Sequence, residues 1–163
     1  MSVSEPEDLS ERRDPALTDT LTFRLIVAMN LIVKPFAAIC GEAHGISLSE
    51  WRCLIWLAAA PGSSGEDTAS GIGMDRMSVS RNLRALQRKG YASRTPDPNN
   101  RKRWQWRLST RGWSVFDEIA AGAIERDRAI TATMTRDEQA RMIRFLDDTI
   151  AMLRAADREQ RGR

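Results

Sequence analysis

The residues best suited to chemistry form a run of cations between Met74 and Gly112. This stretch holds eleven Lys and Arg residues and two acids, whereas the rest of the 163-residue chain holds fourteen basic and twenty acidic residues. The net charge of +3 therefore conceals a strongly basic segment in an acidic remainder. Concentrated cations attract phosphates, while an acidic remainder limits non-specific adhesion. The pattern indicates a nucleic-acid partner.

The first half of the basic segment has the periodicity of an amphipathic helix. Asp75 is a candidate N-cap, and Gly90 is a natural end. At about 100° per residue, one side of the helix is apolar and the opposite side is cationic. The apolar side is formed by Val79, Leu83 and Leu86, and the opposite side by Met77, Arg81, Arg84 and Arg88.

Such a helix fits the major groove of B-DNA, and its N-terminal half meets the base edges. An arginine there can bind guanine bidentately, and a methionine can contact a thymine methyl group. The alternative is a cationic helix face that is merely solvated. The predicted base contacts are Arg76, Met77, Ser78, Ser80 and Arg81, and the predicted phosphate contacts are Arg84 and Arg88.

The second half of the segment predicts a β-hairpin with a basic side. Residues 95–100 (TPDPNN) are dense in turn formers, and residues 103–108 alternate between apolar and polar side chains. The tip cations Arg101, Lys102 and Arg103 are predicted to enter the minor groove. Trp104 and Trp106 could form a stacking platform for single strands, but their two-residue spacing favours packing on a core.

Other predicted helices hold the basic helix and the hairpin in place. Apolar residues recur at helical spacing over residues 16–43, with Pro35 expected to kink that helix. Ser47 and Glu50 form a capping box before a short buried helix, Ser64 is a second possible cap, and two long helices follow Thr110 and Thr135. The predicted fold is mostly α with a small β-wing, a winged helix-turn-helix. Its predicted parts are a flexible tail (1–15), dimerisation helices (16–45 and 111–156), a DNA-binding domain (46–110) and a second flexible tail (157–163).

Other function classes find little support. The longest apolar run, residues 54–60, is far shorter than the ~20 residues that a bilayer span needs, and residues 1–15 lack the apolar stretch of a secretory signal. We therefore expect a cytoplasmic protein with no membrane contact. One histidine and no phosphate-binding or nucleophile motif argue against an enzyme, and no cofactor is expected.

The two cysteines leave further alternatives open. Cys40 and Cys53 do not suggest a disulfide framework, and buried inert thiols are the preferred interpretation. A redox switch that uses them, or a metal site that adds His44, is the alternative, although these three residues fall short of a ligand quartet. The prediction for metal ligands is none.

Five stretches together resemble the MarR (multiple antibiotic resistance regulator) family over about residues 20–155. They are residues 48–54 (LSEWRCL), 74–81 (MDRMSVSR), 86–90 (LQRKG), 96–102 (PDPNNRK) and 108–112 (LSTRG). The wing departs from the family pattern, because Asn100 stands where an aspartate usually orients the following arginine. An amide can still hydrogen-bond Arg101, though more weakly than a carboxylate.

The resemblance implies a homodimer that binds a palindromic double-stranded operator and represses transcription until a small ligand or an oxidant releases it. Family effectors bind near the seam between the dimerisation helices and the DNA-binding lobe, where His44, Trp51 and Arg52 fall by position. Aromatic and cationic groups would suit a small aromatic or anionic effector. The simpler alternative is that Trp51 belongs to the core and Arg52 to the surface. The competing function is a winged-helix protein-interaction module that does not bind DNA.

Overall fold

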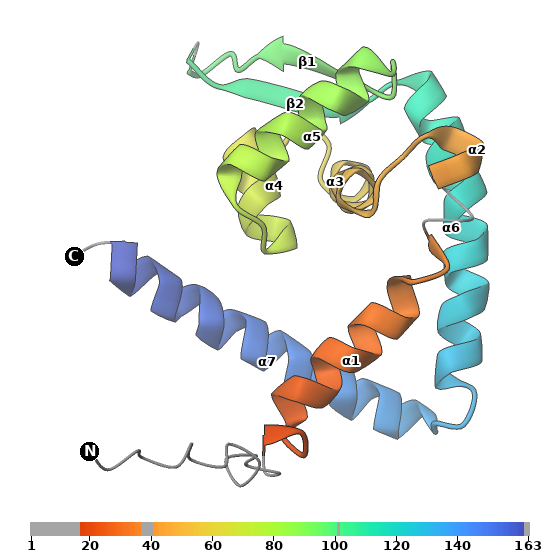
Figure 1. Cartoon of the computed structure of the whole chain (residues 1–163). Coiled ribbons are helices and arrows are strands. Elements are labelled where there is room, and N and C mark those ends of the chain that lie inside the picture. Colours follow the sequence, from red (N-terminus) through yellow and green to blue (C-terminus); the bar gives the residue numbers. More distant parts are fainter. Residues whose placement is uncertain (1–16, 37–40, 101, 162–163) are drawn as a thin grey trace, which may run out of the picture. The chain divides into compact units, whose positions relative to one another are not determined.

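In the computed structural model, residues 17–36, 41–100 and 102–161 are described, and the predicted tail 1–15, Cys40, Arg101 and residues 162–163 lie outside these ranges. Within these ranges the structure consists of helices and one two-stranded hairpin (Figure 1). The elements are α1 (Leu21–Val33), α2 (Glu42–His44), α3 (Leu48–Ala59), α4 (Gly65–Ile72), α5 (Arg76–Arg88), β1 (Ala92–Pro96), β2 (Trp104–Leu108), α6 (Thr110–Thr131) and α7 (Arg136–Arg161). The mostly helical class with a two-stranded wing is confirmed.

Side-chain caps fix where the central helices begin. The Ser47 backbone N–H donates to Glu50 Oε2 at 2.7 Å, and Ser47 Oγ accepts from the Glu50 backbone N–H at 3.2 Å, which completes the predicted capping box of α3. Ser64 and Asp67 form a second capping box at α4. Each cap satisfies backbone donors that a helix start leaves unpaired. The three-residue spacing of these polar side chains therefore determines where α3 and α4 begin.

The first helix is shorter than predicted. It begins at Leu21, where the Thr20 hydroxyl accepts from the Phe23 backbone N–H at 3.2 Å, and not at residue 16. It ends at Val33, with a turn at residues 34 and 35, so the helix is interrupted at Pro35 as predicted; residues 37–40 of the predicted helix lie outside the described residues. Proline removes a backbone donor and disfavours helical geometry in the residue before it. The short helix α2 ends at His44, and its C-cap is Gly45, whose φ is 61°.

The chain divides into two units, Met1–Val115 and Phe116–Arg163, and the division falls within α6. The second unit contains the rest of α6 and the whole of α7. Thr135 and Glu138 form a capping box at the start of α7, the helix predicted to follow Thr135. The prediction of a flexible tail from residue 157 was wrong for residues 157–161, since α7 continues to Arg161. Between residues 157 and 161 the sequence holds no glycine or proline that would end a helix.

The core of the first unit lies among α3, α4 and α5, which pack on one another beneath the hairpin (Figure 1). The fully buried side chains include Leu54 and Leu57 of α3, Thr68 of α4, and Leu83 of α5. Apolar side chains of this size each contribute about 1.5–3 kcal/mol when they leave water. Since each helix buries one side here, the outward sides of α4 and α5 are fixed by the same packing.

The hairpin is anchored to the helices on one side of β2. The Trp106 backbone N–H donates to the Ser63 carbonyl oxygen at 2.9 Å, and the Gly62 N–H donates to the Trp106 carbonyl oxygen at 2.8 Å. Trp106 and Leu108 are buried, as the alternation predicts. Trp104 is not, because 40% of its surface is exposed. It pairs with Pro96 at the outer end of the ladder, beyond the covered part of the strand.

A buried ion pair joins the end of α5 to the start of α3. Lys89 Nζ donates to Glu50 Oε1 at 2.6 Å and to the Gly45 carbonyl oxygen at 2.6 Å. Glu50 is only 4% exposed, so Lys89 supplies the positive charge that its buried carboxylate needs. Tyr91 adds a second link, since its hydroxyl donates to the His44 carbonyl oxygen at 3.2 Å. The C-terminal end of α5 is thereby held against the segment that precedes α3.

We expect Lys89→Met to lower the free energy of unfolding by about 2 kcal/mol. Breaking a fully buried ion pair costs about 3–5 kcal/mol, and the Lys89 side chain, which is 34% exposed, should cost less. Urea denaturation followed by circular dichroism would measure the change. Arg88→Met is the matched control, because it removes an exposed cation next along the chain and should change stability by less than about 0.5 kcal/mol. Equal losses in the two variants would contradict a stabilising role for the pair.

Candidate nucleic-acid interface

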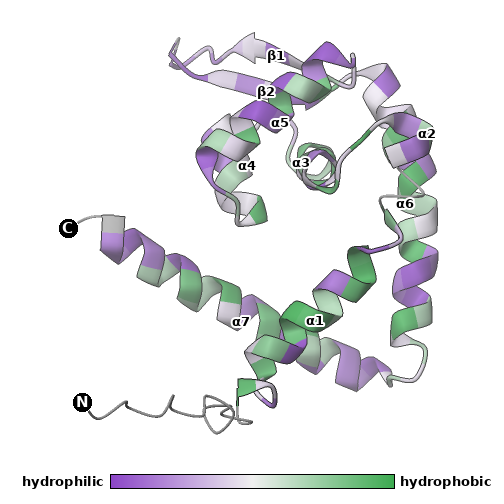
Figure 2. Cartoon of the chain, in the orientation of Figure 1, coloured by the Kyte–Doolittle hydropathy of each residue, from purple (hydrophilic) through white to green (hydrophobic). Residues whose placement is uncertain are grey.

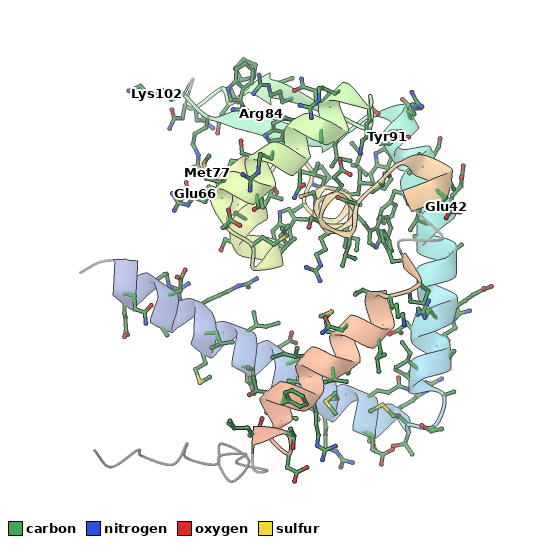
Figure 3. The ribbon with its side chains drawn as sticks, in the orientation of Figure 1. Glu42, Glu66, Met77, Arg84, Tyr91 and Lys102 are labelled. Carbon is green, nitrogen blue, oxygen red and sulfur yellow. The ribbon has the colours of Figure 1, made fainter. Side chains whose placement is uncertain are left out.

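The α5 helix presents a cationic face because its apolar side is completely covered. Val79, Leu83 and Leu86 have no exposed surface, as predicted. On the opposite side, Met77 is 70% exposed, and Arg84, like Arg81 and Arg88, is also exposed. Figure 3 shows Met77 and Arg84 directed away from α3. The rotation of the helix is therefore set by the core, and the outward face carries cations.

The first turn of α5 is ordered by its own polar side chains. Asp75 Oδ1 accepts from the Ser78 backbone N–H at 2.8 Å, which is the predicted N-cap. Hydrogen bonds from the Ser78 backbone and then its side chain hold the pKa of Asp75 below its usual value, so the cap stays ionised at neutral pH. Arg81 Nη2 donates to Ser78 Oγ at 3.0 Å, which directs this guanidinium toward the N-terminal end of the helix.

The predicted contact residues of α5 differ in exposure. Arg76 is exposed and paired with Glu66 at 2.5 Å between its Nη2 and the carboxylate Oε1. Ser78 and Ser80 are half-buried on the two sides of the helix. The structure thus gathers the predicted residues on one surface, with Met77 and Arg81 outermost.

Of the wing cations, Arg103 lies closer to α4 than a tip position implies. Its Nη2 donates to Ser64 Oγ at 3.1 Å and lies 3.6 Å from both Glu66 Oε2 and Asp67 Oδ1. Lys102 is exposed beside it, and Figure 3 shows Lys102 at the free end of the hairpin. In the tip turn, Asn100 Oδ1 accepts from the Lys102 backbone N–H at 3.1 Å. Arg101, the residue that Asn100 was expected to orient, lies outside the described residues.

Two charged residues near this surface were missed by the sequence interpretation. Arg94 of β1 places its guanidinium carbon 4.2 Å from the ring centre of Trp104 and 5.5 Å from that of Trp106. The register pairs Arg94 with Trp106 across the ladder, and a hairpin alignment of the sequence could have found that pair. Glu66 is the second of these residues and lies between Arg76 and Arg103. The sequence around Glu66 does not predict these contacts, because both arginines belong to other elements of the fold.

The predicted effector residues lie on α2 and α3. Trp51 is 6% exposed, and its ring centre lies 6.0 Å from that of Phe36, which favours the core interpretation. Arg52 is half-buried, and its Nη2 lies 3.8 Å from Met29 Sδ. The His44 backbone serves as the acceptor for Tyr91. Of these three residues, Arg52 has the guanidinium that an anionic ligand would need.

Cys53 has the properties of an inert thiol. It has no exposed surface, and burial, followed by the charge of Glu50, raises the pKa of its thiol to about 12. The reactive form of cysteine is the thiolate, which is scarce at neutral pH under these conditions. A redox switch through Cys53 is therefore disfavoured. Cys40 lies outside the described residues, and in the described ranges no group of three or more His, Cys, Asp or Glu side chains is placed to hold a metal ion.

No helix in the described ranges has both the length and the apolar character that crossing a bilayer would require. Figure 2 shows hydrophilic residues interspersed with hydrophobic ones along α5 and the hairpin.

Comparison with known proteins gives matches along most of the chain. The homoprotocatechuate degradative operon repressor of Escherichia coli is 24% identical over 134 residues, which are 82% of this chain and 90% of that repressor. The solved structure of the transcriptional repressor CouR bound to a 23-mer DNA duplex superposes with a TM-score of 0.69 at 24% identity, covering 87% of this chain and 99% of that one. The structure of NadR in complex with 4-hydroxyphenylacetate gives 0.73 at 22% identity, covering 80% and 92%.

The two structural likenesses show a shared fold. The family model described as "MarR family" matches residues 44–103, which run from the end of α2 through the helix-turn-helix to the start of the wing's second strand. These are the residues that position and carry the cationic surface. This segment is therefore similar to the MarR family, and the solved structures show the same winged helix-turn-helix fold over most of the chain.

Proposed function

We propose that this chain is a ligand-responsive repressor that binds a palindromic operator as a homodimer. The observation that carries the proposal is the orientation of α5, whose buried stripe leaves a continuous cationic face in the solvent. A helix so placed can enter a major groove, while the wing lies along the flanking backbone and minor groove. The DNA-bound structure of CouR supports this use of the fold.

Within the interface we assign different tasks to the two halves of α5. The N-terminal half is closest to base edges in helix-turn-helix docking, and the C-terminal half follows the phosphates. Arg81, aligned along the first turn by Ser78, is the leading candidate for a bidentate contact to guanine. The proposed base contacts are Arg76, Met77, Ser78, Ser80 and Arg81, and the proposed backbone contacts are Arg84, Arg88, Arg101, Lys102 and Arg103.

A second copy of the chain would cover apolar surface that the monomer leaves in water. In α1, Leu21, Ile26 and Leu31 are each more than half exposed, and Figure 2 shows apolar residues along most of this helix. In α7, Ile143 and Leu153 are each 59% exposed. Apolar surface of this extent is uncommon in monomers and supports self-association. The helices predicted as dimerisation elements are the ones that carry it.

The repressor assignment and the effector class draw on the relatives. The Escherichia coli relative is a repressor of a degradative operon, and NadR was solved with an aromatic carboxylate. For this chain we assign the carboxylate to Arg52 and an aromatic contact to His44, whereas Trp51, buried against Phe36, is assigned to the core. The guanidinium of Arg52 is suited to this task, since arginine binds carboxylates through two parallel hydrogen bonds.

Arg81→Ala tests the assignment of α5. Binding would be measured by gel retardation with two probes, a duplex enriched from a random library by the wild-type chain and a random-sequence duplex of equal length. We expect the enriched duplex to lose about 1–3 kcal/mol of binding free energy per lost base contact, with a relaxed sequence preference.

Arg84→Ala is the matched control, and it should weaken both duplexes alike and reduce the salt dependence by about 0.9 per phosphate contact. An equal loss on both duplexes for Arg81→Ala would make Arg81 a phosphate contact. If the wild-type chain retards neither duplex at low salt, the repressor proposal fails, and the protein-interaction alternative takes its place.

The effector assignment is tested with 4-hydroxyphenylacetate as the probe. We expect it to release the enriched duplex from the wild-type chain and to require a several-fold higher concentration with Arg52→Gln, because a neutral amide cannot pair with the carboxylate. Titration followed by fluorescence anisotropy of the labelled duplex would measure both curves. Release at the same concentration from both proteins would contradict a role for Arg52.

A further inference from the structure

One carboxylate lies between two arginines of the proposed DNA interface. Glu66 Oε1 is 2.5 Å from Arg76 Nη2, and Glu66 Oε2 is 3.6 Å from Arg103 Nη2. Arg76 is the first residue of α5, and Arg103 immediately precedes β2. Glu66 therefore connects the recognition helix and the wing through the second residue of α4. Figure 3 shows Glu66 beside Met77, on the side of the lobe that also carries Lys102.

The neighbouring acid has a different task. Asp67 Oδ2 accepts from the Ser64 hydroxyl at 2.7 Å and from the Ser64 backbone N–H at 3.0 Å, and these bonds keep the pKa of Asp67 low. Asp67 is thus held mainly by the cap of α4, and its other oxygen, Oδ1, also lies 3.6 Å from Arg103 Nη2. The capping box is formed by Ser64 and Asp67, whereas Glu66 makes ion pairs with two arginines, Arg76 and Arg103. The side chains of Glu66, Arg76 and Arg103 are 52%, 61% and 42% exposed, so DNA can reach all three.

We propose that Glu66 is a specificity-determining residue that weakens binding to non-operator DNA more than binding to the operator. The proposal rests on the function proposed above. Binding to arbitrary sequence depends almost entirely on neutralised phosphates. With Glu66 present, Arg76 and Arg103 already have a counter-charge, and the carboxylate repels any phosphate that approaches them. Operator binding adds contacts to base edges. Of the proposed base contacts, Arg76 is the one that Glu66 engages, and Met77, Ser78, Ser80 and Arg81 still add affinity for the operator alone.

A merely structural role for Glu66 is disfavoured by its exposure. Ion pairs between exposed side chains contribute little to stability, because water and salt screen them. Replacing Glu66 should therefore leave the fold intact while removing the counter-charge. The salt dependence of DNA binding distinguishes the two roles, since a structural change would not add phosphate contacts. The slope of log K against log salt should become steeper by about 0.9 for each arginine that gains a phosphate.

Glu66→Gln in the full chain tests the proposal, with Glu42→Gln as the matched control. Glu42 is an exposed acid on α2, on the other side of the lobe from Glu66 in Figure 3, and its replacement changes the net charge equally. Both variants would be titrated with the enriched duplex and the random-sequence duplex at several salt concentrations. We expect Glu66→Gln to bind the random duplex about five-fold more tightly with a slope steeper by about 1–2 per module, and the enriched duplex less than two-fold more tightly.

Three results would overturn the proposal. Glu66→Gln could match Glu42→Gln on both duplexes, which would make its effect one of net charge alone. It could instead weaken both duplexes equally, which would make Glu66 a positioning residue for the arginines. If the wild-type chain prefers no sequence at all, the proposed function fails and this proposal fails with it. A preference for the enriched duplex that is reduced in Glu66→Gln alone, because binding to the random duplex has tightened, supports the proposal.

Discussion

The burial of one side of α5 is the constraint on which the rest of this structure depends. Val79, Leu83 and Leu86 are completely covered by α3, α4 and the hairpin. An apolar stripe of three side chains contributes several kcal/mol, at about 1.5–3 kcal/mol each, and no alternative rotation of the helix would retain that gain. Since side chains on a helix repeat every 3.6 residues, fixing the stripe also fixes the opposite face. The arginines of α5 face the solvent because the apolar side chains on the opposite side of the helix are buried.

Both ends of the helix are then held by polar interactions. Asp75 caps the N-terminal end, and Lys89 bonds the buried Glu50 near the C-terminal end. The segment after α5 is held as well, since Ser109 Oγ donates to the Gly90 carbonyl oxygen at 2.6 Å. A surface that binds a rigid duplex gains from such order, because less freedom is lost on binding. Glu66 adds a restraint of another kind, because it occupies two arginines whose charge would otherwise be available to any phosphate.

Local features of the fold could be predicted from the sequence, and long-range ones could not. The caps at Ser47, Ser64 and Asp75 involve residues three positions apart, so their spacing is visible in the chain. The buried stripe of α5 follows from its period. The pair of Glu50 with Lys89 joins residues 39 positions apart and depends on how α3 packs against α5. The ion pairs of Glu66 with Arg76 and Arg103 likewise depend on how α4 packs against α5 and the hairpin. The interruption at Pro35 was also visible in the sequence, because proline lacks the backbone donor that a helix needs.

The central claim is that the outward face of α5 meets the bases of an operator. Site-specific photo-crosslinking tests it most directly, with benzoylphenylalanine in place of Met77, which is 70% exposed on that face, or in place of Glu42 on α2. Each protein would be irradiated with the duplex enriched by the wild-type chain, and the linked nucleotide would be mapped. We expect a link from position 77 to a base within the preferred sequence and none from position 42. A complex that forms normally yet links through position 42, with no link from position 77, would contradict the proposed contact between α5 and the bases.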